Sequence, residues 1–131
     1  MSQALRLLYT SRLSGRSSIP YVGEFVKKMR KYCKEHELTG MLVFDGESIA
    51  QYLEGNRASV QRLMNHLQED TRFDSVNTLM FGETDAQPEF PTWSMAYPRD
   101  DAFDTLKALS DRAGDDAVQY FKQLQPTLDV V

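Results

Sequence analysis

Apolar and polar residues follow two different periods along the first part of the chain. Residues 4–10, ALRLLYT, form a short apolar run of the kind that makes a buried strand. From about residue 21 to residue 36 the apolar positions recur every three or four residues, with lysines on the opposite face, as in an amphipathic helix. A polar loop joins the two segments and ends at Pro20, a residue suited to the first turn of a helix. We therefore expect strand, loop and helix in that order.

The strongest local signal is a tight hairpin in the middle of the chain. Asp45-Gly46 separates two apolar segments, residues 38–44 and 48–53, and this dipeptide favours a short turn between antiparallel strands. Gly55-Asn56 should then end the second strand, with Asn56 capping a second amphipathic helix. The apolar positions of that helix are Val60, Leu63, Met64 and Leu67.

Two more strands are predicted after the second helix. They cover residues 76–81 and 93–97, and Pro98 ends the latter. The resulting order, β-α-β-β-α-β-β, is that of a ferredoxin-like α+β fold, in which two helices cover one face of a mixed sheet. We assign residues 1–98 to this domain.

The last part of the chain, residues 99–131, has a different pattern. Two helical segments, 101–113 and 115–125, are broken at Gly114 and stopped by Pro126. Both carry an apolar stripe. This helical extension should therefore pack on the free face of the sheet or at a subunit interface, and we expect a homo-oligomer.

Composition and charge narrow the cellular setting and the partners. The chain has 131 residues and a formal net charge of −4, with its lysines and arginines scattered among acids, which argues against nucleic acid as a partner. Its single cysteine allows no intramolecular disulfide. No apolar run approaches the ~20 residues that span a bilayer, and the first residues do not resemble a signal peptide. We expect a cytoplasmic protein without a membrane partner.

Residues suited to metal binding or nucleophilic catalysis do not form known groupings. Cys33, His36 and His66 lack the spacings of metal ligands, so no metal site is predicted. The chain contains no G-x-S-x-G, G-x-G-x-x-G or P-loop motif. Cys33 falls on the inner face of the first helix, where a buried, inert thiol is expected. The sequence thus gives no sign of an enzyme, although a small hydrolase on this type of sheet remains an alternative.

Four residues at strand positions stand out for their chemistry. Tyr9 lies late in the first strand, Gln51 in the third, and Trp93 and Met95 in the fifth. A tyrosine or tryptophan in a strand is usually part of the core. A glutamine among apolar neighbours is less ordinary, because its two donors and its acceptor need partners once buried.

Around these residues the chain resembles the BLUF family, the blue-light sensors that use flavin. The shared features are LLYTS with Tyr9, ELTGMLVFDGESIAQYLEG with Gln51, SVQRLMNHLQED continuing into TRF, and FPTWSM with Trp93 and Met95. They cover about residues 4–98, and the chain resembles the short, stand-alone members of the family.

The resemblance implies a flavin, FAD or alternatively FMN, between the two helices and beside the sheet. Blue light would excite the flavin, Tyr9 would pass it an electron and a proton, and the Gln51 amide would reorganise its hydrogen bonds. Trp93 and Met95 would relay this change to an unidentified downstream protein. The resemblance adds further flavin contacts: Phe25, Met29, Tyr32 and Cys33 on the first helix, and His66, Asp70 and Arg72 at the end of the second.

The first helix departs from the family in one place. Cys33 stands where the family has an asparagine that bonds the polar edge of the flavin ring, and a thiol is a weak donor and a weak acceptor. Tyr32 and Phe25 are also bulky for a site that admits a ring. Two hypotheses follow: a flavin-binding blue-light photoreceptor, or a flavin-free protein of the same fold that acts as an interaction or oligomeric scaffold.

Overall fold

The structure, a computed structural model, describes residues 4–13, 19–69, 73–84, 88–98 and 103–130. Up to α4, strands and helices follow one another as the sequence predicts, and the ferredoxin-like α+β order is confirmed. The elements are β1 (Ala4–Leu13), α1 (Ile19–Glu35), β2 (Thr39–Phe44), β3 (Ser48–Asn56), α2 (Arg57–Glu69), β4 (Phe73–Thr84), β5 (Trp93–Pro98), α3 (Phe103–Ser110), α4 (Gly114–Gln123), a 3₁₀ turn (Gln125–Thr127) and β6 (Leu128–Val130).

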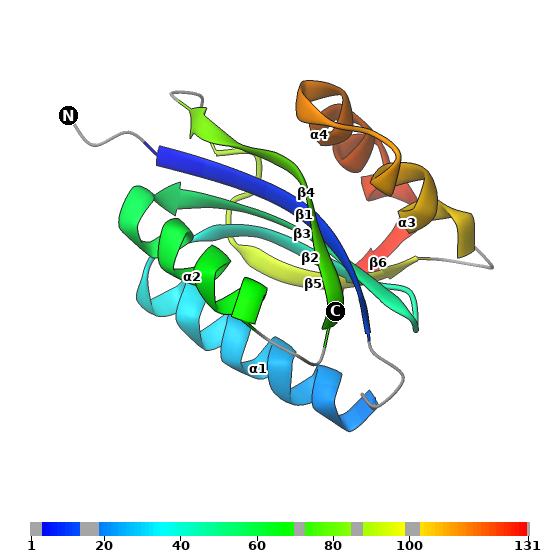
Figure 1. Cartoon of the computed structure of the whole chain (residues 1–131), viewed down its shortest axis with the longest axis horizontal. Helices are drawn as coiled ribbons and strands as arrows, with labels where there is room; N and C mark the ends of the chain where they lie inside the picture. Colours follow the sequence, from blue (N-terminus) through cyan, green and yellow to red (C-terminus); the bar gives the residue numbers. More distant parts are fainter. Residues whose placement is uncertain (1–3, 14–18, 70–72, 85–87, 99–102, 131) are drawn as a thin grey trace.

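In the described part of the chain the strands form one mixed sheet, in the order β4-β1-β3-β2-β5-β6. β2 and β5 are parallel, and the other neighbouring pairs are antiparallel. Figure 1 shows α1 and α2 over one face of the sheet and α3 and α4 over the other. The sheet is therefore the middle layer of three, and its two faces lie in different surroundings.

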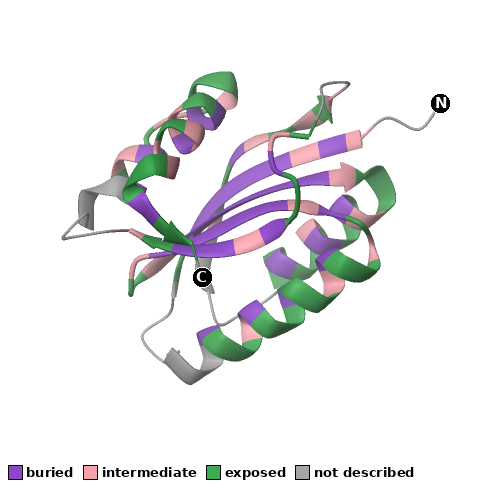
Figure 2. Cartoon of the chain, turned by 180° about the vertical axis from the view of Figure 1, so that it is seen from behind, coloured by how far each residue is buried: buried purple, intermediate pink, exposed green. Residues whose placement is uncertain are grey.

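Each face of the sheet has its own core, because successive side chains of a strand point to opposite faces. On β1, Leu7 and Tyr9 belong to the core under α1 and α2, whereas Leu8 belongs to the core under α3 and α4. Val26 of α1 and Phe121 of α4 are buried in these two cores. Figure 2 shows the same division, with buried residues on the sides of the helices that face the sheet.

The predicted hairpin between β2 and β3 is present. Oδ1 of Asp45 accepts the backbone N–H groups of Glu47 at 2.9 Å and Ser48 at 2.8 Å. Gly46 adopts a φ of +103°, which a residue with a side chain rarely takes. The turn fixes the register of β2 against β3, and this register positions Gln51.

The sequence predicts that β3 ends at Leu53, but the strand runs three residues further. The strand continues through Gly55 to Asn56, because the glycine is needed for a close approach and does not act as a break. Its φ is +152°, and an added Cβ would lie 2.5 Å from Cδ2 of Leu38. Asn56 caps α2 as predicted, since its Oδ1 accepts the N–H of Ala58 at 2.9 Å and that of Ser59 at 3.3 Å.

Other boundaries also differ from the prediction. β4 spans Phe73–Thr84, beyond the predicted 76–81 at both ends. α3 ends at Ser110, earlier than the predicted 113. β6 was not predicted, because three residues are too few to carry a period-two pattern, and its position depends on pairing with β5.

Candidate functional site

Four strands bring the singled-out strand residues into one row. Tyr9 of β1 is the register partner of Gln51 of β3, Gln51 is paired with Leu42 of β2, and Leu42 with Met95 of β5. Trp93 lies two residues before Met95 on the same strand. The register therefore gathers Tyr9, Gln51, Trp93 and Met95, as the resemblance implies, on the face that α1 and α2 cover.

A buried chain of hydrogen bonds links three of these side chains. Nε2 of Gln51 donates to Oη of Tyr9 at 2.6 Å, and Nε1 of Trp93 donates to Oε1 of Gln51 at 2.9 Å. Gln51 and Tyr9 are fully buried, and Trp93 is 8% exposed. Because these bonds lie in a medium of low dielectric constant, breaking one of them is costly.

The indole decides which way the amide of Gln51 points. The N–H of an indole can only donate, so the amide atom that faces Trp93 must be the acceptor Oε1. Nε2 then faces Tyr9. Turning the amide over would set the Nε2 donors against the indole N–H, and two donors repel each other. The orientation of Gln51 is thus coupled to the presence of Trp93.

The sheet has a bulge next to Tyr9. The register between β1 and β4 shifts between Leu8 and Tyr9. Bulges raise the local twist and re-aim side chains, and they are frequent next to functional sites. The pairing of Tyr9 with Gln51 on the other side of β1 stays regular.

The inner face of α1 covers the site. Met29 and Cys33 are buried in the core that contains Tyr9, while Phe25 and Tyr32 are half-buried against it. Oη of Tyr32 donates to the carbonyl oxygen of Ser59 at 2.9 Å, which ties α1 to the first turn of α2. Burial raises the pKa of Tyr32.

Cys33 is fully buried, as predicted. Burial raises the pKa of its thiol to about 12, so the side chain is neutral near pH 7. It lines a cavity of about 460 Å³, together with Trp93, Leu38 and Arg30 among others. A neutral thiol at this position offers a weak donor and a weak acceptor to whatever lies beside it.

The end of α2 is described only in part. His66 lies in the last turn of α2 and is exposed. Asp70 and Arg72 fall outside the described residues. The predicted roles of these three residues remain predictions.

Sequence reasoning missed two charged residues, one beside Trp93 and one on the opposite face of the sheet. The guanidinium Cζ of Arg30 lies 5.4 Å from the centroid of the Trp93 ring. Glu54, three residues after Gln51 on β3, is only 4% exposed and accepts bonds from Oη of Tyr52 at 3.2 Å and from the backbone N–H of Glu89. The alternation along β3 gave the one available signal, because it places Glu54 beside Ala50 and Tyr52 on the face opposite Gln51.

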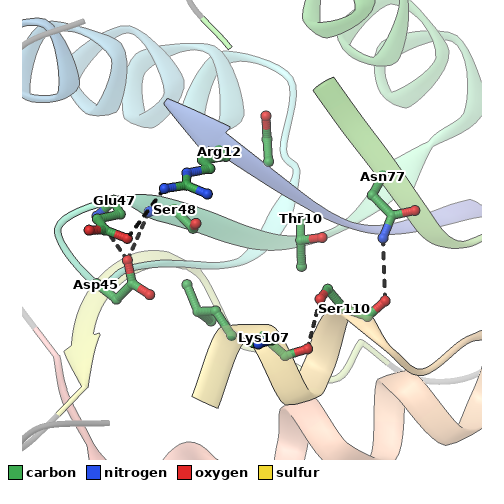
Figure 3. Close-up of a pocket in the computed structure, with 10 residues that line it drawn as sticks. Thr10, Arg12, Asp45, Glu47, Ser48, Asn77, Lys107 and Ser110 are labelled. Atoms are coloured by element: carbon green, nitrogen blue, oxygen red, sulfur yellow. Dashed lines mark hydrogen bonds and ion pairs between the residues drawn. The ribbon is translucent and has the colours of Figure 1, made fainter. Parts of the chain in front are cut away.

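A second pocket, of about 430 Å³, lies between the hairpin, β1, β4 and α3 (Figure 3). Its polar groups bond one another: Arg12 lies 3.9 Å from Glu47, and Nδ2 of Asn77 donates to the carbonyl oxygen of Ser110 at 3.4 Å. Asp45 is occupied by the hairpin turn. We interpret this pocket as the polar seam between α3 and the sheet.

The described ranges contain no group of three or more histidine, cysteine, aspartate or glutamate side chains able to hold a metal ion. No helix in the same ranges has the length and apolar character needed to cross a membrane.

Comparison with known proteins gives one family and several related folds. The family model BLUF, described as sensors of blue-light using FAD, matches residues 4–96. BlsA in its photo-activated state is 22% identical over 95% of this chain and 94% of its own, with a TM-score of 0.73. BlrB, a BLUF protein in its dark state, is 20% identical over 95% of this chain and 96% of its own, with a TM-score of 0.67.

A third structure belongs to a longer protein. Klebsiella pneumoniae BlrP1, solved with FMN and cyclic diGMP, is 22% identical over 70% of this chain, with a TM-score of 0.62. The chain matches 25% of the length of that protein. At these identities the structures support the fold alone. No curated protein sequence matches the chain.

Proposed function

This chain belongs to the BLUF family, the sensors of blue light that use FAD, and on that premise we propose that it is a photoreceptor whose photoactive pair is Tyr9 and Gln51. The observation that supports the proposal most is the pair of buried hydrogen bonds that link Tyr9 to Gln51 and Gln51 to Trp93. The family binds flavin, and the cofactor proposed for this chain is FAD, with FMN as the alternative.

The residues around Gln51 suit a flavin in most respects. A flavin ring needs apolar walls, and the facing sides of α1 and α2 supply them with Val26, Met29, Leu63 and Leu67. It also needs a hydrogen-bond partner at its polar edge. The carboxamide of Gln51 is such a partner, because its Nε2 carries two N–H groups and the bond to Tyr9 uses one of them.

The chain's own groups carry the proposed light response. A bound flavin supplies the absorption of blue light and an acceptor for an electron. Tyr9 would supply the electron and its hydroxyl proton and would take both back once Gln51 has turned; its oxygen is already 2.6 Å from Nε2 of Gln51. Gln51 then turns its amide over, which exchanges a donor for an acceptor at the same place without moving the backbone.

The turning of Gln51 would displace Trp93. Once Nε2 faces the indole N–H, the bond of 2.9 Å between these side chains is replaced by a repulsive contact, so the indole must leave. Met95 lies two residues along β5 and only 5% exposed in the same core, and its flexible thioether can fill the space. We propose that this exchange on β5 is the readout passed to a downstream protein.

The second candidate function is a flavin-free scaffold of the same fold. It is favoured by the neutral, buried thiol of Cys33 at the polar edge of the proposed site. The bond from Tyr32 to Ser59, which ties α1 to α2, also favours it. In this case the protein would act through its surface, as an interaction module or as a homo-oligomer, and Tyr9 and Gln51 would be structural.

Absorption spectra separate the two functions. The purified chain is incubated with excess FAD or FMN in the dark, freed of unbound flavin, and measured before and during blue illumination. The photoreceptor predicts structured flavin bands that shift reversibly to the red under blue light. A chain that retains neither flavin would be the scaffold.

A further inference from the structure

We propose that Arg30 of α1 is a positioning residue that holds the Trp93 indole inward, against Gln51. Its guanidinium Cζ lies 5.4 Å from the centroid of the indole ring, within the range of a cation–π contact. The N–H of the same ring donates to Oε1 of Gln51 at 2.9 Å. Arg30 thus extends the series of contacts from Tyr9 through Gln51 and Trp93 to the protein surface.

Arg30 and Trp93 differ in exposure, and this difference lets Arg30 shield the indole. Arg30 is an exposed residue of α1, whereas Trp93 is 8% exposed, so the guanidinium covers the ring from the solvent side. A cation over the face of an indole attracts the electrons of the ring. This attraction also makes the indole N–H a stronger donor toward Gln51. Arg30 therefore favours the inward ring in two ways, as a cover and through its charge.

Space for another position of the ring lies directly beside it. The cavity of about 460 Å³ is lined by Trp93 itself, by Arg30 and Cys33 of α1, and by Pro91 and Thr92, which precede β5. An indole released by Gln51 would have this volume next to it. Because Arg30 lines the same cavity, it is placed to oppose that movement.

Trp93 is the only tryptophan in the chain, so tryptophan fluorescence comes from this position alone. The full-length protein is studied in the dark, with and without added flavin, as wild type and as Arg30→Met, Arg30→Gln and Arg30→Lys. Methionine keeps much of the aliphatic length of arginine, glutamine keeps polarity, and lysine keeps the charge. Lys34→Met is the matched control, because Lys34 lines the same cavity one turn further along α1 and carries the same charge.

The inward-holding role predicts a specific order among the variants. Arg30→Met and Arg30→Gln should raise the acrylamide quenching constant of Trp93 about twofold or more and shift its emission to the red. Arg30→Lys should stay close to wild type, and Lys34→Met should match wild type. Far-ultraviolet circular dichroism verifies that each variant is folded. Wild-type quenching in both neutral Arg30 variants, or an equal rise in Lys34→Met, would overturn the proposal.

The consequence for light rests on the proposed function. In the flavin-loaded protein, Arg30→Met should slow the return to the dark spectrum severalfold, because the inward indole has lost a stabilising partner, whereas Lys34→Met should leave the rate unchanged. If the chain binds no flavin, the proposed function fails, and the fluorescence of the flavin-free protein still decides the role of Arg30.

Discussion

The two faces of the sheet hold polar groups of opposite character on the same strand. On the face under α1 and α2, β3 presents Gln51, a neutral amide bonded to a neutral phenol and a neutral indole. On the face under α3 and α4, the same strand presents Glu54, a nearly buried carboxyl. An amide has a donor end and an acceptor end and can exchange them, whereas a carboxylate only accepts.

This difference assigns the two faces different tasks. Glu54 accepts bonds from Tyr52 and from the backbone of Glu89, in the segment that leads into β5. The side chain of Glu89 pairs with Lys122 of α4 at 2.8 Å. The charged face thus anchors the start of β5 to β3 and to α4. We infer that the neutral face is the one that rearranges, while the charged side chains of the other face hold the strands in place.

Removing the amide of Gln51 should have the largest effect on the neutral face. Gln51→Leu deletes both hydrogen bonds of the neutral face and keeps an apolar side chain of similar size. We expect complete loss of the light-induced red shift while bound flavin remains, measured as the light-minus-dark difference spectrum. The matched control is Glu54→Gln on the opposite face, which should keep the shift. An unchanged shift in Gln51→Leu would remove Gln51 from its proposed role.

The next largest effect is expected on flavin binding, from a change at Cys33, the residue that differs from the family's asparagine. Cys33→Asn replaces a weak hydrogen-bonding group by a carboxamide, and one good hydrogen bond is worth about 1 kcal/mol. Flavin should therefore bind about fivefold more tightly, measured by titration in the dark. Cys33→Ala is the control and should bring no gain. Equal affinities for asparagine and alanine at this position would show that Cys33 does not limit flavin binding.

The smallest effect is expected from Glu54 on the charged face. It is a pH-dependent change in the free energy of unfolding. Burial raises the pKa of Glu54 above its ordinary value. The folded protein therefore holds this proton more tightly than the unfolded chain, so the contribution to stability is full below the ordinary pKa and is lost as pH rises through the raised one. Glu54→Gln stays neutral, so its stability relative to wild type should increase from about pH 4 toward neutral pH.

Urea unfolding at several pH values measures this difference in the free energy of unfolding. Glu24→Gln, a change of the same kind at an exposed position of α1, should show no comparable trend. A constant difference between Glu54→Gln and wild type across this pH range would contradict the assignment of a raised pKa to Glu54.

The sequence predicted those parts of the fold that depend on neighbouring residues. Asp45-Gly46 specifies its turn through a local bond and a positive φ, and Asn56 caps α2 through groups two and three residues away. Gly55 was misread because its role depends on Leu38, which is distant in sequence. β6 could not be predicted, because so short a strand exists only through its partner β5.

The candidate site was predictable to the extent that the family motifs carry it. Tyr9 and Gln51 were singled out together through the resemblance, and the register between β1 and β3 explains their contact. Arg30 was not predicted, because its position over Trp93 depends on how α1 lies across β5. Residue type and helical spacing assign Arg30 only to the exposed side of α1. The roles of His66, Asp70 and Arg72 remain predictions.

We propose that the turning of Gln51 and the departure of Trp93 are one event. Because the chain has a single tryptophan, one indole N–H signal in a ¹H–¹⁵N spectrum reports it directly. In the flavin-loaded protein this proton should be protected from solvent exchange in the dark. Under steady blue light its signal should move and exchange faster, and both changes should reverse in step with the absorption spectrum. An indole signal that stays unchanged while the flavin bands shift would contradict the coupling.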